Sequence, residues 1–217
     1  MPGSASGTLA LLHTSPVHVP VFETLRDEDH PGLGLRHLVR EDLLARAREE
    51  GAEAVAPAVA AALAEAVDEG ASAVLCTCST IGGVAEACAA DLGVPVLRVD
   101  RPMAAAAAAA DRIVVVAALL STLEPTLALI REEAAGRGVA LRTLLVEGAW
   151  ERFEAGDREG YLDAVAAAVD SVREADVIVL AQASMADAAA RTTTPVAVLS
   201  SPRPGLWAAA GATASGS

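Results

Sequence analysis

Short runs of apolar residues alternate along this chain with longer segments in which apolar residues recur at helical spacing. Most of the runs are bounded by Gly, Pro or polar residues, and they are too short for typical helices, so they predict strands. The predicted strands are residues 9–12, 33–39, 73–76, 96–99, 113–117, 139–146, 177–181 and 196–199. Helices are predicted between them, including residues 40–50, 54–69, 123–135 and 161–174. This alternation is typical of the α/β class, with right-handed βαβ units and parallel sheets.

A weak internal repeat divides the chain into two halves. Residues 35–39 resemble residues 141–145, residues 74–80 resemble 178–184, and residues 94–96 resemble 194–196. Three matches in the same order predict two pseudo-symmetric lobes, each a short parallel sheet flanked by helices, with an active-site cleft between them. The alternative is chance similarity in a chain rich in Ala, Val and Leu. The predicted division is a disordered leader at 1–7, a first lobe of 8–100 plus 196–217, and a second lobe of 101–195.

Composition narrows the classes of function. Of the 217 residues, 53% are apolar and only 2% aromatic, which suits a close-packed aliphatic core and not the aromatic platforms that bind nucleic acids. The net charge of −13 would repel a polyanion, so no nucleic-acid partner is expected. The sequence has no uninterrupted apolar run long enough for a membrane span and no signal-peptide pattern at its start, and its three cysteines lack paired spacing. A cytoplasmic protein without a membrane partner is therefore expected.

Small polar residues follow four of the predicted strands. In parallel sheets, ligands bind outside the carboxyl ends of the strands, so these residues are candidates for substrate binding. They are His13, Thr14, Ser15, Cys78, Ser79, Thr80, Ser121, Thr122, Gln182 and Ser184. Hydroxyl groups beside backbone N–H groups suit a carboxylate ligand.

Cys78 is the candidate reactive thiol. It lies in a turn that is expected to lead into a helix, and a helix N-terminus favours the thiolate, which is the reactive form. Cys76, inside a strand, and Cys88, among alanines, are expected to be packing residues. The spacing Cys76-Thr77-Cys78 has no second Cys or His cluster to complete a zinc site, and the four histidines are scattered over the first lobe, so no metal is expected. His13 is open to two interpretations, a general acid or orienting donor and a structural hydrogen-bonding residue.

At these residues the chain resembles the aspartate/glutamate racemase superfamily, which includes hydantoin racemases, maleate isomerases and arylmalonate decarboxylases. Cys78-Ser79-Thr80 is similar to the first Cys-Asn-Thr loop of that family, and residues 181–187 (AQASMAD) resemble its Gly-Cys-Ala-Gly-Met-Ala-Asp segment. The resemblance extends from about residue 9 to residue 203. It implies two α/β lobes and cofactor-independent isomerase chemistry of amino-acid metabolism, in which two thiols act on opposite faces of the substrate α-carbon.

The chain departs from that pattern at the second thiol, which corresponds to Gln182. An amide side chain cannot exchange a proton, so two-thiol racemisation is not expected. The leading hypothesis is a cofactor-independent enzyme with the single thiol Cys78 that acts on a small carboxylate or amino-acid-like substrate. The alternatives are a decarboxylase of the same superfamily and a carboxylate-binding protein without catalysis. Alanine-rich helix faces pack readily, which favours a homo-oligomer.

Overall fold

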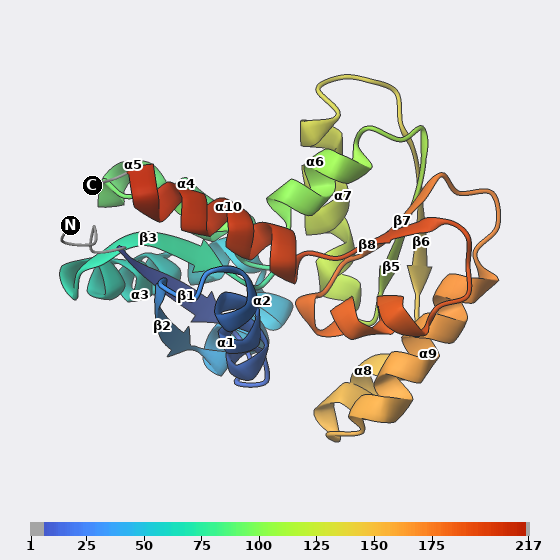
Figure 1. Cartoon of the computed structure of the whole chain (residues 1–217), viewed down its shortest axis with the longest axis horizontal. Helices are drawn as coiled ribbons and strands as arrows, with labels where there is room; N and C mark the ends of the chain where they lie inside the picture. The colour runs from blue at the N-terminus through green and yellow to red at the C-terminus, as the bar shows by residue number, and fades with distance from the viewer. Residues whose placement is uncertain (1–6, 216–217) are drawn as a thin grey trace. The chain divides into compact units, whose positions relative to one another are not determined.

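The computed structural model describes residues 7–215, so the predicted leader, apart from Gly7, lies outside the described residues. The chain divides into two compact lobes (Figure 1). The first lobe contains residues 7–99 and 202–215, and the second contains residues 100–201. Each lobe has its own four-stranded parallel sheet with helices on both faces, which confirms the predicted fold class.

The first sheet has the strand order β2-β1-β3-β4. Its strands are β1 (Thr8–His13), β2 (Gly34–Val39), β3 (Ala71–Cys76) and β4 (Val96–Arg98). The central strands β1 and β3 are almost fully buried, which explains their continuous apolar runs, whereas the edge strand β2 carries charged side chains such as Arg36. The carboxyl ends of these parallel strands therefore meet at one edge of the sheet.

Two sets of helices cover the faces of this sheet. One face packs against α1 (His18–Asp29) and α10 (Pro202–Ser215), through Phe22, Leu206 and Ala209. The other face is covered by α2 (Glu41–Glu50), η1 (Ala52–Val55), α3 (Ala56–Asp68), α4 (Gly82–Ala87) and α5 (Ala89–Leu92). The helix predicted over 54–69 is divided between η1 and α3, and Pro57 lies in the first turn of α3, where its missing N–H is tolerated. Figure 1 shows α10 lying along the first lobe.

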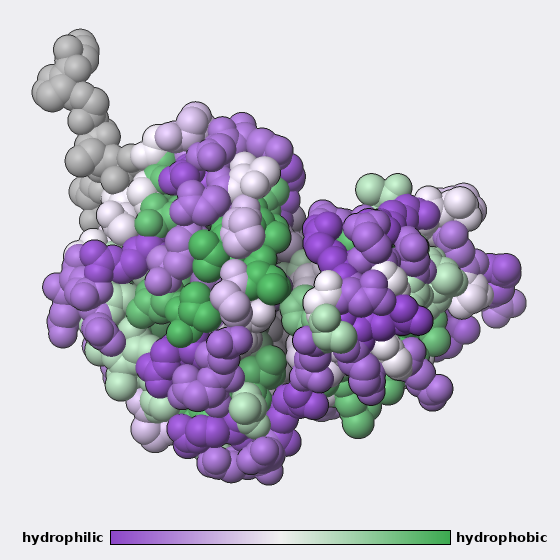
Figure 2. All heavy atoms as spheres, turned by 90° about the horizontal axis from the view of Figure 1, so that it is seen from below, coloured by the Kyte–Doolittle hydropathy of each residue, from purple (hydrophilic) through white to green (hydrophobic). Residues whose placement is uncertain are grey.

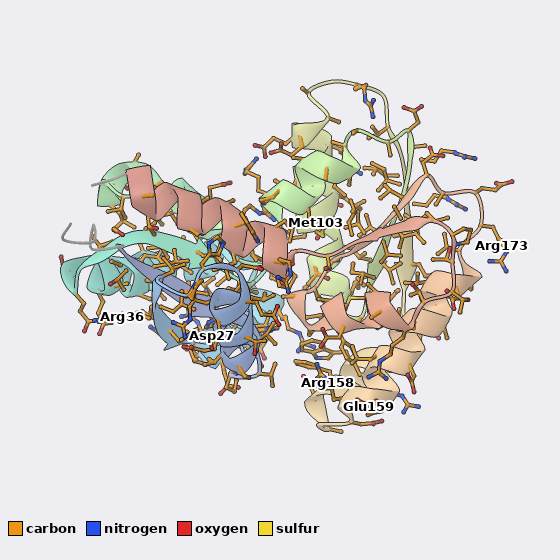
Figure 3. The ribbon with its side chains drawn as sticks, viewed as in Figure 1. Asp27, Arg36, Met103, Arg158, Glu159 and Arg173 are labelled. Carbon is orange, nitrogen blue, oxygen red and sulfur yellow. The ribbon has the colours of Figure 1, made fainter. Side chains whose placement is uncertain are left out.

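The second sheet has the order β6-β5-β7-β8. Its strands are β5 (Arg112–Ala117), β6 (Ala140–Leu145), β7 (Val177–Leu180) and β8 (Ala197–Leu199). One face packs against α6 (Arg101–Ala107) and α7 (Leu123–Glu133), and Met103 on α6 points into this layer (Figure 3). The other face packs against α8 (Ala149–Glu154), α9 (Arg158–Ser171) and η3 (Ala183–Arg191). The helix predicted from residue 161 begins at Arg158 because the Asp157 side chain accepts a hydrogen bond from Gly160 N at the helix start.

The two sheets repeat the same register. In the first, Leu11 pairs with His37 and Leu12 pairs with Cys76. In the second, Val115 pairs with Thr143 and Val116 pairs with Leu180. The short linear repeat in the sequence therefore corresponds to a repeat of strand order and pairing, and it matches position 13 with 117, 77 with 181, and 78 with 182.

The structure corrects the predicted lobe boundary. Residues 196–217 were expected to return to the first lobe, but β8 pairs with β7 and belongs to the second sheet. Only the segment from Pro202 onward joins the first lobe, through α10. The similarity of 194–196 to 94–96 is consistent with this arrangement, because β4 and β8 occupy the same place in the two sheets.

Charged side chains are distributed over the outer helix faces. Hydrophilic residues cover much of the surface seen in Figure 2, with smaller hydrophobic patches between them. In Figure 3, Arg158 and Glu159 project from α9, and both form ion pairs, with Asp187 and Arg191 respectively. Arg191 also binds Asp163, and these carboxylates raise its pKa. Across residues 7–215, no helix is long and apolar enough to cross a membrane.

Candidate functional site

The first-lobe candidates gather at the carboxyl edge of the first sheet. His13 is the last residue of β1, Thr14 and Ser15 follow it, and the Cys78 turn follows β3. His13, Thr14, Ser79 and Thr80 are buried, whereas Ser15 and Cys78 are half-buried. The structure thus brings together, at one sheet edge, the six candidates that the sequence predicts for this lobe.

The three thiols differ in their surroundings. Cys76 is buried in β3, and its Sγ lies 3.6 Å from the carbonyl oxygen of Cys78. The Cys88 thiol donates to Val84 O at 3.4 Å, and burial, followed by the charge of Asp91, raises its pKa. Cys78 is half-buried at the strand end. Of the three, it alone combines partial exposure with a position beside a row of hydroxyl groups.

The helix expected to begin at Cys78 begins later. Residues 79–81 form a turn, and α4 starts at Gly82 and has only six residues. Because the helix dipole acts mainly within the first turn, α4 contributes less to a Cys78 thiolate than the sequence predicted. The turn itself encloses the hydroxyl of Thr80, which has no hydrogen-bond partner among residues 7–215.

Arg98 is a buried cation that the sequence reasoning missed. It is the last residue of β4, pairs with Cys76 in the sheet, and packs against α4. A Cβ on Gly82 would lie 3.1 Å from Arg98 Cβ and 3.2 Å from its Nε, so a residue with a side chain would crowd it. The pair Gly82-Gly83 was the available signal, since glycine in this position indicates close approach of a neighbouring group.

His13 belongs to a hydrogen-bonded group of side chains. Its Nδ1 lies 2.8 Å from Thr77 Oγ1, and its Nε2 lies 2.8 Å from His37 Nδ1. His37 Nε2 in turn lies 3.0 Å from Glu23 Oε1. Burial, with smaller contributions from the charges of His18 and His37, lowers the pKa of His13 to about 3, so its ring is neutral at neutral pH.

Three histidines that the sequence analysis treated as scattered therefore lie close together. The ring centroids of His13 and His37 are 5.1 Å apart, and those of His13 and His18 are 6.2 Å apart. Burial lowers the pKa of His18 to about 4. His37 lies two residues before the end of β2. Its position on the same strand face as Leu35 and Val39 was the only available signal.

The second-lobe candidates lie at the carboxyl edge of the second sheet. Gln182 follows β7 and is buried, and its Oε1 accepts hydrogen bonds from Ala118 N at 2.7 Å and Leu119 N at 3.3 Å. These two donors fix Oε1 as the acceptor, so the side-chain NH₂ is the donor that remains. Between residues 7 and 215, this nitrogen makes no hydrogen bond and is not an enclosed atom. Gln182 therefore offers an oriented hydrogen-bond donor, but it has no acidic group that could exchange a proton with a substrate.

The hydroxyls of this lobe have different roles. Thr122 donates to Leu119 O at 2.7 Å, within its own turn. Ser184 is hydrogen-bonded to the Tyr161 hydroxyl at 2.8 Å, and burial raises the pKa of Tyr161 to about 12. Ser121 Oγ is enclosed and has no hydrogen-bond partner in the described part of the chain, as is true of Thr80 Oγ1 in the first lobe. Ser121 and Thr80 thus retain free binding capacity, whereas Thr122 and Ser184 are held by the protein itself.

Within the described part of the chain, no group of three or more His, Cys, Asp or Glu side chains is arranged to hold a metal ion. The second sheet edge offers hydroxyls and an amide. The first edge offers a thiol, neutral imidazoles, hydroxyls and the guanidinium of Arg98 at the end of β4. This set suits binding and proton transfer on a small carboxylate.

Several solved structures share the fold. Glutamate racemase from Francisella tularensis in complex with D-glutamate has a TM-score of 0.72 at 11% identity, covering 94% of this chain and 81% of that one. Aspartate racemase from Picrophilus torridus has a TM-score of 0.71 at 12% identity, covering 96% and 93%. A liganded arylmalonate decarboxylase with one glycine changed to cysteine and one cysteine to serine has a TM-score of 0.65 at 19% identity, covering 97% and 94%.

At these identities the structural matches show a common fold. No curated protein matches the chain by sequence. The model of the Asp/Glu/hydantoin racemase family matches residues 9–209, which includes both sheets and every candidate residue described above. The chain therefore belongs to the Asp/Glu/hydantoin racemase family.

Proposed function

We propose that this protein is a cofactor-independent enzyme that acts on a small carboxylate or amino-acid-like substrate, with Cys78 as its single reactive thiol. The observation that carries the proposal is the pairing of a half-buried thiol with the enclosed, unpartnered hydroxyl of Thr80 at one strand end. A buried hydroxyl without a partner is costly by about 1–3 kcal/mol, and a bound carboxylate oxygen would offer it an acceptor.

The proposed chemistry is proton transfer at the carbon beside the carboxylate. Cys78 Sγ, as the thiolate, takes the proton when the C–H bond breaks, and the electron pair is delocalised into the carboxylate as an enediolate. Return of the proton from Sγ reverses the step. Thr14, Ser15, Ser79 and Thr80 would bind the substrate in the first lobe, and Ser121 and Gln182 are the polar groups at the corresponding edge of the second lobe.

Gln182 determines which reactions are consistent with one thiol. Racemisation by two thiols needs a second acid, and an amide cannot supply one. Its NH₂ group, oriented by the hydrogen bonds to Oε1, would instead donate to the developing negative charge of an enediolate. Gln182 is thus proposed as an electrostatic stabiliser.

Decarboxylation is the second candidate, and the replacement of the second thiol by Gln182 favours it. When the C–C bond to a carboxylate breaks and CO₂ leaves, the carbanion needs one proton, which a single Cys78 thiol can give. The shared fold with arylmalonate decarboxylase supports considering a malonate-type substrate.

The test is turnover and solvent-deuterium exchange, followed by NMR, with a panel of amino acids, hydantoins, maleate and arylmalonates. We expect Cys78→Ala to lower the rate for an accepted substrate by about 10²–10⁴, the range typical of a lost acid–base group. Cys88→Ala is the matched control, because that thiol donates within its own helical segment, and it should leave the rate unchanged. Equal rates in wild type and Cys78→Ala would show that another group acts as the base. Saturable binding without exchange or turnover would instead identify a binding protein.

A further inference from the structure

Four side chains form a continuous hydrogen-bonded row behind the first-lobe strand ends. The row, here called the histidine chain, consists of Glu23, His37, His13 and Thr77. Glu23 lies on α1 and its side chain is 40% exposed, whereas His13 and Thr77 are buried on the β1 and β3 side. The row thus leads from the solvent to the residue that directly precedes Cys78.

The fold does not require this row. At the matching positions of the second sheet, Ala117 replaces His13, Ala181 replaces Thr77 and Thr143 replaces His37. That sheet has the same strand order and register; Ala117 and Ala181 belong to its apolar core, and Thr143 is exposed. Burying polar side chains has a cost that an alanine avoids, so their presence in one lobe alone points to a task other than support of the sheet.

The hydrogen bonds of the histidine chain can be satisfied in two ways. In the first, Thr77 donates to His13 Nδ1, His13 Nε2–H donates to His37 Nδ1, and His37 Nε2–H donates to the Glu23 carboxylate. Both rings are neutral in this arrangement. Leu12 O is still bonded, because it accepts from Thr77 N at 3.0 Å.

In the second arrangement, the Thr77 hydroxyl donates to Leu12 O, at 3.1 Å. His13 then donates from Nδ1 to Thr77 Oγ1 and accepts at Nε2 from His37 Nδ1–H. Since His37 also donates from Nε2 to Glu23, it carries both ring protons and is an imidazolium. The second arrangement adds the hydrogen bond from Thr77 Oγ1 to Leu12 O, and the two differ by one proton.

We infer that the histidine chain holds one proton as a unit and links its uptake to the strand end that carries Cys78. On uptake, a hydronium ion of the solvent gives up the added proton, and an O–H bond to it forms at Thr77 Oγ1, directed at Leu12 O, as that hydroxyl passes its own proton to His13 Nδ1. The Nε2–H bond of His13 breaks as an N–H bond forms at His37 Nδ1. Any catalytic role of this relay beside Cys78 rests on the function proposed above, whereas the relay itself does not.

A carboxylate faces His37, whereas a second histidine faces His13. From α1, Glu23 contacts His37 directly, and Arg26 forms an ion pair with the other Glu23 oxygen. His18, also on α1, disfavours a charge on His13. The second helix on this face, α10, contributes Leu206 and Ala209 to the core, and its Arg203 is ion-paired with Glu28 and Asp29 of α1. From the strands, the other titratable groups of the row are His13 and His37 themselves.

The first measurement uses the whole wild-type protein and no substrate. Imidazole ¹⁵N shifts of His13 and His37 are followed by NMR from pH 5 to pH 9. We expect His13 to change from the Nε2–H to the Nδ1–H tautomer, without becoming an imidazolium, at the same midpoint at which His37 becomes charged. Separate midpoints for the two rings, or a His13 tautomer that does not change, would overturn the inference.

The second measurement tests the link to Cys78. The alkylation rate of Cys78, followed by mass spectrometry with Cys88 as the internal reference, should show a step at the same midpoint. Glu23→Gln removes the carboxylate that faces His37 and should lower that midpoint by about one pH unit, a tenfold change in proton affinity. Glu28→Gln is the matched control, because Glu28 carries the same charge on α1 but binds Arg203. A Cys78 profile that is identical in wild type and Glu23→Gln would overturn the link, even if Cys78 proved essential for turnover.

Discussion

The two sheets have the same strand order, but the side chains at their carboxyl edges differ in chemistry. In the first lobe, the matched positions carry His13, Thr77 and Cys78, which include a thiol and an ionisable ring. In the second lobe they carry Ala117, Ala181 and Gln182, and the amide oxygen of Gln182 is bound to two backbone N–H groups. Strand order and register are equal, so the backbone is not the source of this difference. The first edge therefore carries groups that can exchange protons, whereas the second carries an amide fixed by backbone hydrogen bonds.

The largest expected change in stability comes from removing the fixed hydrogen bonds of the second edge. Gln182→Ala leaves Ala118 N and Leu119 N without their acceptor in a buried place, and we expect a loss of about 3 kcal/mol in the free energy of unfolding. Gln182→Glu keeps an acceptor for both N–H groups and should retain more of the stability while losing the donor. Urea denaturation of the three proteins measures the difference, and an unchanged midpoint for Gln182→Ala would contradict the proposed role of the amide oxygen.

The pH dependence of stability should distinguish the first edge from the second. The pKa of His13 is lowered to about 3 in the folded protein, from about 6.5 in an unfolded chain. Below pH 6.5 the unfolded chain takes up a proton that the folded chain excludes, so stability is retained above this pH and lost as the pH falls toward 3. We expect His13 to account for a loss of about 1.4 kcal/mol for each pH unit over this window, and His18, whose pKa is lowered to about 4, adds a similar loss down to that pH.

Urea denaturation between pH 7 and pH 4.5 provides the measurement. His13→Gln should reduce the slope of the free energy of unfolding against pH by about 1.4 kcal/mol per pH unit, which is the contribution of one proton. This holds whatever the effect of the substitution on stability at neutral pH. Tyr161 and Gln182 in the second lobe should not contribute to this slope. If the slope were the same in wild type and His13→Gln, His13 would not be buried in its neutral form.

The smallest expected effect concerns the hydroxyl pair of the second lobe. Tyr161→Phe removes the bond to Ser184 Oγ but keeps the buried ring, and we expect a loss of about 1 kcal/mol. Ser184→Ala leaves the buried Tyr161 hydroxyl unpaired and should cost at least as much. A double variant that is no less stable than either single variant would show that the two hydroxyls contribute to stability through the hydrogen bond between them.

Much of the fold could be predicted from the sequence because its signals are local. Each buried strand is a continuous apolar run, as in residues 113–117, and the helices between them show helical spacing. The assignment of β8 to the wrong lobe had a different cause, since a strand of three residues carries little pattern of its own. The likeness of residues 194–196, which lead into β8, to residues 94–96 was the better guide to its lobe.

The site was predictable in position but not in the state of its groups. Strand ends can be located from the sequence, so Cys78, Thr80, Ser121 and Gln182 could be named. Whether a hydroxyl is free depends on neighbours that are distant in sequence, as for Ser184 and Tyr161, or on the geometry of its own turn, as for Thr122. The contact between His13 and His37 likewise depends on strand register, which no residue pattern in this single sequence reveals.

The route of the chain between the lobes has a consequence for the order of folding during synthesis. The second lobe is continuous in sequence, whereas the first is completed only by α10, whose Leu206 and Ala209 fill its core. On the ribosome, the second lobe therefore emerges in full while the first still exposes the apolar side chains of Leu9, Leu11 and Leu75. The half of the protein that is made first is the half that is finished last, and its exposed core is the part of the nascent chain with most need of protection from aggregation.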